Sequence, residues 1–295
     1  MRFTAAYLID QDHHYVPVFY LKQWAESDGR VPYFQWLSQR IIQSRVTPKY
    51  TAYETNLYAR DKVPVEERHN VEAFFQKLDT EAALIYRRLL NLEKFEFSVD
   101  ERLAWAMFLT AANLRTPDIV RLVKDDATRT LKEKLNENPE EVERILGHRP
   151  AMSLLEFAEK SHPGLVENFG LDMMLRHLTN EDRLKEVMGM EWSVHSVPAS
   201  NNELLTCDRP LWYMENPTHK EFAMVLPLSP RVLFVASRNG KLNRAITHER
   251  DGVIAEKLNI SIISRALERV YGRARPAFLE RVFKSQKAHR ATIAE

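Results

Sequence analysis

Glycine and cysteine are scarce in this chain of 295 residues, which has 8 glycines and 1 cysteine. Neither a G-x-G-x-x-G pattern nor a P-loop pattern occurs, and this argues against a nucleotide site built on a glycine-rich loop. The single Cys207 excludes an intrachain disulfide and fits a reducing, cytoplasmic setting. Because it lies in an apolar, strand-like run, we expect a small core residue rather than a nucleophile.

Long apolar runs are also absent. No uninterrupted run reaches the length of about 18 residues that a transmembrane helix needs, and the first ten residues lack the features of a signal peptide. We therefore expect a soluble, cytoplasmic protein without a membrane partner. Neither sign of charge dominates, since 42 basic and 41 acidic side chains give a net charge of +1. Nucleic acid is expected, if at all, only at the basic tail 273–290, for which a solvated C-terminus is the preferred interpretation.

Apolar residues make up 44% of the sequence, enough for a sizeable core. Their pattern predicts an α+β fold, in which a predominantly helical body carries a small antiparallel sheet formed from N-terminal and C-terminal segments. We expect a single domain over residues 1–295. Its predicted parts are an N-terminal β-hairpin segment at 1–64, a helical body at 65–190, a β-rich segment at 191–240, and C-terminal helices with the basic tail at 241–295.

Alternating apolar residues predict the strands. The stretches 31–37 and 40–46 have this pattern and predict a hairpin. Two apolar stretches, 221–226 and 231–237, predict an antiparallel pair about a Pro-Leu-Ser-Pro corner, and the N-terminal hairpin is a candidate to join their sheet. Towards the C-terminus, the sequence from 248 to 273 predicts a helix with a kink near its middle.

A break in the helical body singles out Arg115. The sequence Arg-Thr-Pro places Pro117 where it ends one helix and suits the first turn of the next. An arginine at such a break can bind an anion or clamp a carboxylate, and the clamp is preferred. Glu81 is the carboxylate we consider, because it falls beside the apolar stripe of the preceding helix. Its head is either held in a polar contact or solvated.

The densest signal lies near the N-terminus, where His13 and His14 precede an aromatic run that ends at Trp24. Adjacent residues of an extended chain point to opposite sides, so at most one of the two histidines readily serves a given site. The apolar residues of this segment indicate that most of it anchors the core.

Several motifs resemble those of the domain-of-unknown-function family 4238. The matching stretches are His13–Leu21, Glu54–Tyr58, Arg115–Pro117, Leu205–Pro210, Leu226–Pro230, Leu258–Asn259 and Arg269–Tyr271. They span most of the chain in the family's order, and the N-terminal motif is the most specific. The chain departs from the pattern at Cys207-Asp-Arg, where the family usually has Ser-Asp-Asn, and at Gly272, where serine is usual. The resemblance implies membership without an activity.

Two hypotheses follow from the polar residues of this set, and whether the protein is an enzyme stays open between them. The favoured one is a non-catalytic ligand- or partner-binding protein, in which the set forms a structural network and Asn259 contributes to binding. The alternative is a metal-assisted hydrolase acting on a phosphodiester, with a divalent metal as cofactor. Its catalytic residues would be His14, Glu81, Arg115 and Asp208, and its metal ligands His13, His14, Glu54 and Asp208. The absence of an H-E-x-x-H motif from the sequence argues against the hydrolase. Both hypotheses require His14 to lie near Glu81, Arg115 or Asp208.

Overall fold

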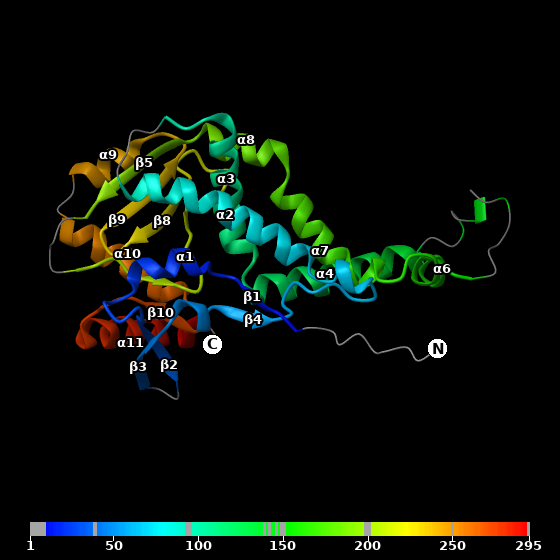
Figure 1. Ribbon diagram of the computed structural model, residues 1–295, viewed down its shortest axis with the longest axis horizontal. Helices are drawn as coiled ribbons and strands as arrows, with labels where there is room; N and C mark the ends of the chain where they lie inside the picture. Colours follow the sequence, from blue (N-terminus) through cyan, green and yellow to red (C-terminus); the bar gives the residue numbers. More distant parts are fainter. Residues whose placement is uncertain are drawn as a thin grey trace. The chain divides into compact units, whose positions relative to one another are not determined.

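The structure is a computed structural model, and its described residues are 10–37, 40–91, 96–137, 140, 143–144, 147, 152–197, 202–248 and 251–293. They form helices and small antiparallel sheets, which confirms the predicted α+β class (Figure 1). The chain divides into two compact units. Unit 1 comprises 10–13, 54–77 and the described part of 117–180, and unit 2 comprises the described residues of 14–53, 78–116 and 181–295. That one domain covers the whole chain stays a prediction.

Unit 1 is mainly helical. Besides the first part of α2 (Asn70–Leu90), its helices are η3 (Val65–Glu67), α4 (Pro117–Glu137), α6 (Leu154–Ser161) and α7 (Leu165–Leu178). The helix α6 begins at a capping box, in which Ser153 accepts from the backbone of Glu156 and the glutamate accepts from the backbone of Ser153. The break before α4 falls at Pro117, as the sequence predicts.

The close contact between α4 and α7 organises unit 1. Val166, Gly170 and Met174 recur every four residues on α7, and both apolar members are buried. A β-carbon on Gly170 would lie 2.5 Å from Cα of Lys124 and 2.8 Å from the carbonyl oxygen of Val123. The two helix backbones therefore touch directly, and only glycine leaves room for the contact.

Unit 2 contains two four-stranded antiparallel sheets. The first has the order β3-β2-β10-β6, and the second has the order β5-β9-β8-β7. The strands of the first are β2 (Val31–Leu37), β3 (Arg40–Val46), β6 (Thr206–Cys207) and β10 (Arg269–Tyr271), and those of the second are β5 (Glu191–Ser196), β7 (Trp212–Met214), β8 (Ala223–Ser229) and β9 (Val232–Ser237). A further short pair joins β1 (Asp12–His14) to β4 (Tyr53–Thr55).

The helices of unit 2 come from all its segments. They are α1 (Val18–Leu21), η1 (Lys22–Trp24), η2 (Pro48–Tyr50), the second part of α2, α3 (Val99–Leu114), α8 (Glu181–Gly189), α9 (Lys241–His248), α10 (Asp251–Arg265) and α11 (Pro276–Ile293). In the part of the chain that the structure describes, none of the helices combines the length and apolar character needed to cross a bilayer.

Two sequence predictions about the sheets need correction. The N-terminal hairpin pairs with β10 rather than with β8 or β9, so terminal segments do share a sheet, but a second sheet forms within 191–237. The predicted helix over 248–273 is wrong beyond Arg265, because residues 269–271 form a central strand. The reason is tertiary. Val270 is buried in the core, and Asp208 binds the backbone just before the strand.

The helices α10 and α11 pack against the first sheet and form a hydrophobic core with it. Phe34, Cys207 and Val270 from the sheet pack with Ile262 of α10 and Leu279 of α11. Cys207 is completely buried, as expected for a core residue. This packing fixes where α11 begins relative to the strands.

Gly170 provides a test of the packing in unit 1. In an isolated helix, alanine is favoured over glycine by about 1 kcal/mol. In α7 the added β-carbon would meet backbone atoms, and overpacking typically costs about 1–3 kcal/mol. Because the atoms that it meets belong to the backbone of α4, we expect a cost near the upper end, about 3 kcal/mol. After the gain of about 1 kcal/mol in helix propensity, Gly170→Ala should lower the free energy of unfolding by about 2 kcal/mol, measured by urea denaturation.

The matched control is Gly189→Ala at the end of α8, where nothing lies within 4 Å of the added atom. It should leave the stability nearly unchanged. Equal stability of the Gly170 variant and the wild type would contradict direct backbone contact between α4 and α7.

Candidate anion-binding groove

Arg115 is a buried carboxylate clamp, and its partner is Asp79. The arginine side chain is fully buried, with its Nη1 2.8 Å from Oδ1 of Asp79. Burial raises the pKa of Asp79, while the charges of Arg115 and then of His14 oppose this rise. His14 itself donates from Nε2 to the carbonyl oxygen of Lys49 at 3.1 Å. The charges of His14 and Arg115 thus act on the same carboxylate.

Glu81, the carboxylate considered from the sequence, is exposed. Asp79 is the residue that sequence reasoning missed. It lies three residues before Ala82 and seven before Tyr86, both of which are buried, so it shares their side of α2. This spacing was the available signal.

His13 belongs to unit 1 and lies in a buried histidine pair. Its Nδ1 accepts the backbone N–H of Tyr58 at 2.9 Å, so Nε2 carries the proton and donates to Nδ1 of His69 at 3.0 Å. The ring also stacks on Tyr58, with centroids 5.4 Å apart. Burial, followed by the charge of His69, lowers the pKa of His13 to about 4. Both ring nitrogens of the neutral imidazole are therefore engaged in hydrogen bonds.

Asp208 and Asn259, in unit 2, are bound to backbone groups. Asp208 accepts the N–H groups of Leu267, Glu268 and Arg269 at 2.5–2.9 Å. Burial raises the pKa of Asp208, and these three hydrogen bonds oppose the rise. Asn259 accepts from the N–H of Leu205 at 2.8 Å and donates to the carbonyl oxygen of Glu203 at 2.7 Å.

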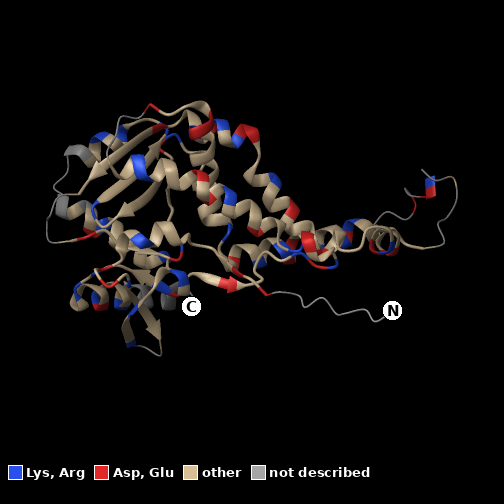
Figure 2. Ribbon diagram, in the orientation of Figure 1, with Lys and Arg blue, Asp and Glu red and all other residues tan. Residues whose placement is uncertain are grey.

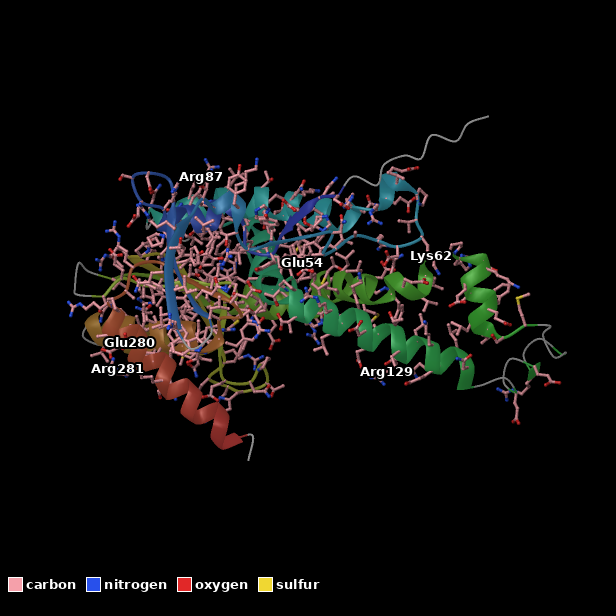
Figure 3. The ribbon with its side chains drawn as sticks, turned by 90° about the horizontal axis from the view of Figure 1, so that it is seen from below. Glu54, Lys62, Arg87, Arg129, Glu280 and Arg281 are labelled. Carbon is pink, nitrogen blue, oxygen red and sulfur yellow. The ribbon has the colours of Figure 1, made fainter. Side chains whose placement is uncertain are left out.

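The four predicted metal ligands thus each bind a different partner within the protein. Glu54, labelled in Figure 3, pairs with Arg121 at 2.5 Å in unit 1, where His13 also lies, whereas His14 and Asp208 lie in unit 2. Among the residues that the structure describes, no group of three or more His, Cys, Asp or Glu side chains could hold a metal ion.

The turn from Glu26 to Arg30 forms one wall of a hollow of about 500 Å³. Glu26 accepts from Arg273 at 2.7 Å and from Arg45 at 3.0 Å, and Arg45 also reaches Asp28 at 3.0 Å. Arg273, then Arg45, hold the pKa of Glu26 below its usual value. The residues around this hollow are Glu26, Arg30, Pro32, Tyr33, Phe34, Gln43, Ser44, Arg45, Arg273 and Ala274.

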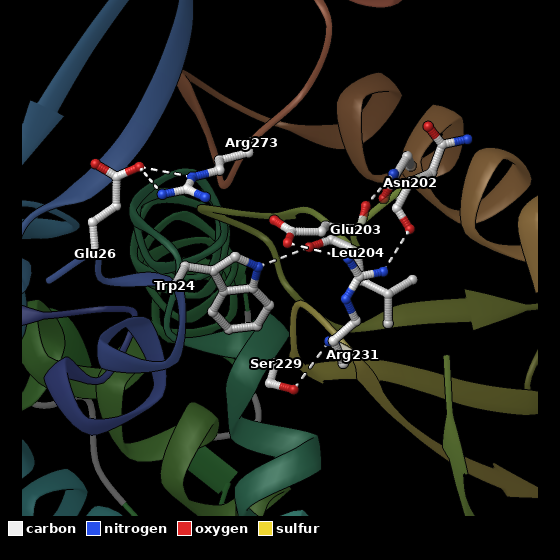
Figure 4. A network of polar contacts seen from close by, with 9 residues as sticks. Trp24, Glu26, Asn202, Glu203, Leu204, Ser229, Arg231 and Arg273 are labelled. Carbon is white, nitrogen blue, oxygen red and sulfur yellow. Dashed lines mark hydrogen bonds and ion pairs between the residues drawn. The ribbon is translucent and has the colours of Figure 1, made fainter. Parts of the chain in front are cut away.

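A second hollow of about 410 Å³ adjoins the first. Figure 4 shows its polar contacts: Arg231 donates to Glu203 at 3.3 Å and to the carbonyl oxygen of Asn202 at 3.5 Å. Its backbone N–H donates to Ser229 at 3.1 Å. The residues around the second hollow are Asn202, Glu203, Arg231, Asn259, Arg273, Ala274, Arg275, Pro276 and Phe278.

Arg273 and Ala274 line both hollows, which we together call the arginine groove. Its position depends on Gly272, which has φ +119° and donates its N–H to the carbonyl oxygen of Pro32 at 2.8 Å. A β-carbon on Gly272 would lie 3.0 Å from Cδ1 of Trp24, so the chain turns closely past the indole. It then delivers Arg273 to the groove.

The groove concentrates positive charge. Acidic and basic side chains are interspersed over the ribbon in Figure 2, and the whole chain carries a net charge of +1. Around the groove, five arginines face two glutamates, and Asp28 beside Arg45 leaves a local excess of two positive charges. The helix α11 begins at Pro276 beside them, and its positive dipole end adds to the same potential. Sequence reasoning missed this site because the arginines come from turns and strand ends without a common period.

Comparison with known families gives one match. The model of the family described as "Protein of unknown function (DUF4238)" matches residues 12–276, which is most of the chain. No match was found among curated proteins or solved structures. The match covers the N-terminal histidines and ends where α11 begins.

The buried His13 predicts a pH-dependent stability. Its folded-state pKa of about 4 lies below the unfolded value of about 6.5, so the unfolded chain binds the proton more tightly. The free energy of unfolding should therefore be highest above pH 6.5 and fall by up to about 3 kcal/mol as the pH drops towards 4. Urea denaturation across this pH range measures the slope.

The variant His13→Asn keeps an acceptor for the N–H of Tyr58 but does not titrate, so it should lose much of this slope. The exposed His162→Asn is the matched control and should keep it. An unchanged slope in His13→Asn would show that other groups cause the pH dependence.

Proposed function

Since the chain belongs to the DUF4238 family, whose description names no activity, we propose from the groove that it is a non-catalytic ligand-binding protein for phosphate-bearing anions. The observation that carries this proposal is the excess of arginine around two adjoining hollows. Guanidinium groups bind phosphate oxygens with paired, charge-assisted hydrogen bonds. A local excess of two positive charges in a nearly neutral chain favours an anionic ligand.

Two of the arginines support this assignment most directly. Within the described part of the chain, neither Arg30 nor Arg275 has a carboxylate partner, and both are exposed at the groove. They can bind a ligand without breaking an internal ion pair. Arg45 contacts its two carboxylates through Nη1 alone, which leaves further N–H groups for an incoming anion.

The size of the groove fits a ligand with more than one charge. Each hollow falls within the range of about 300–1,000 Å³ that is typical of small-molecule sites. Because the positive charge is divided between two adjoining hollows, with Arg273 in both, a ligand with several phosphate groups would contact more arginines than a monoanion. Asn202, Gln43 and Ser44 add polar groups for the uncharged parts of such a ligand.

The lining residues favour binding over catalysis. Neither histidine nor cysteine is among the described residues around the two hollows. Both glutamates of the groove accept from arginine, Glu26 from two of them and Glu203 from Arg231. A carboxylate held in this way is a poor general base, because its lone pairs already serve a cation.

Arg273 should dominate binding of a polyphosphate probe. We expect the wild type to bind inorganic tripolyphosphate, and Arg273→Gln to weaken binding about tenfold or more, since it removes the guanidinium that both hollows share. Isothermal titration calorimetry measures the affinity. Binding should weaken as sodium chloride is raised.

Two further variants separate binding from folding. Arg30→Gln removes a charge that no carboxylate of the described chain pairs with, so it should weaken binding while leaving the melting temperature unchanged. Arg176→Gln changes an exposed arginine of α7, which does not line the groove, and should bind as the wild type does. Absence of binding, or equal affinities of wild type, Arg30→Gln and Arg273→Gln, would refute the proposal.

A further inference from the structure

The strand β3 is the outer strand of the first sheet. It pairs with β2 over its whole length without a bulge, and no strand of the described chain pairs with its other side. Natural proteins commonly protect such an edge with a proline, a lysine or a bulge, and β3 has none of these. Its open side therefore offers backbone donors and acceptors to a further strand.

The contact with β10 shows which backbone groups are open. Gly272 donates its N–H to the carbonyl oxygen of Pro32, so the backbone of Pro32 faces β10. Arg45 lies opposite Pro32 in the β2–β3 pair, and the direction of hydrogen bonding alternates along an antiparallel pair. The N–H and C=O groups of Arg45 therefore point away from β2, as do those of Gln43 and Ile41. None of these groups has a partner in the described residues.

These open groups border the arginine groove. Phe34 lies opposite Gln43, and Pro32 lies opposite Arg45, so the four side chains share one face of the sheet. All four line the first hollow together with Arg273. A strand added antiparallel to β3 would place the residue opposite Gln43 on this face. Its side chain would then enter the hollow that Arg45 and Arg273 line.

The opposite face of the edge offers an apolar contact. Ile42 is 40% exposed, and Leu37, which is 51% exposed, is its diagonal neighbour on β2. Because side chains alternate along a strand, the residue next to the one opposite Gln43 would point to this face and cover Ile42. The strand β3 itself carries two arginines and no acidic residue, which favours an acidic segment as its partner.

We propose that the ligand of the arginine groove is a phosphorylated, extended segment of a partner protein, which adds to β3 as an antiparallel strand. The phosphorylated residue lies opposite Gln43 and places its phosphate among the arginines, and an apolar neighbour covers Ile42. The inference rests on the proposed function, because the same arginines bind the phosphate. It adds the open backbone of β3, which an inorganic polyphosphate does not use.

Calorimetry with the wild-type protein and a capped heptapeptide tests this inference. The peptide has a central phosphoserine flanked by valines, with threonine at the other positions. It should bind at least about tenfold more tightly than capped phosphoserine, because backbone hydrogen bonds add to the phosphate contact. The unphosphorylated peptide should bind at least about tenfold more weakly than the phosphopeptide, because it lacks the charge that the arginines recognise.

Methylated peptides test the strand pairing without changing the protein. The N–H of the phosphoserine faces β3, so its N-methylation should weaken binding about tenfold. The N–H of the following valine points away from β3, which makes N-methylation there the matched control, with little effect expected.

Gln43→Pro and Gln43→Ala form a matched pair on the protein. Both lack the glutamine side chain, but only proline removes the open N–H, and it leaves the bonds to β2 intact. The proline variant should bind the phosphopeptide about tenfold more weakly than the alanine variant. The two variants should bind tripolyphosphate with equal affinity and melt at similar temperatures.

The outcomes separate this inference from the proposed function. If tripolyphosphate binds and Arg273→Gln weakens it, but the phosphopeptide binds no more tightly than capped phosphoserine, the groove stands and the strand addition is wrong. Equal effects of the two methyl groups would also overturn the strand addition. So would a wild-type dimer in sedimentation that Gln43→Pro dissociates, because a second copy would then occupy the edge. Failure of both tripolyphosphate and the phosphopeptide to bind would refute both proposals.

Discussion

The carboxylate of Asp208 is the constraint on which most of unit 2 depends. It accepts three consecutive backbone N–H groups, from Leu267 to Arg269, directly after α10 ends. These amides would otherwise lack partners at the point where helix changes to strand. By binding them, Asp208 ties β6 to the start of β10, which in turn pairs with β2 of the N-terminal hairpin. One buried side chain thereby joins segments that lie far apart in the sequence.

The arginine groove depends on this contact. Arg273 lies four residues after the bound amides, past the turn at Gly272. The register of β10 therefore decides where the guanidinium of Arg273 is placed. Because α11 starts only three residues after Arg273, the same register also places the positive end of that helix at the groove. The positions of the arginines follow from the fold rather than from a local motif.

The sequence predicts the features that local chemistry determines. The hairpin of 31–37 and 40–46 and the helix start at Pro117 both depend on neighbours within a few residues, and the structure has them. Three residues are too few to show an alternating pattern within a stretch whose sequence predicts helix, so the sequence does not predict β10. Its strand conformation depends on Asp208, about sixty residues earlier. Of the candidate site residues, Arg115 has its predicted carboxylate clamp, but the partner is Asp79, whereas the groove arginines have no period to detect.

The buried charges of this chain show how compensation differs from site to site. The fully buried Arg115 meets the carboxylate of Asp79, and the buried Asp208 meets three amides. Each follows the general rule that a desolvated charge requires a partner. The two solutions differ in kind, because Asp79 brings an opposite charge to Arg115, whereas Asp208 is stabilised by amide dipoles that carry no net charge.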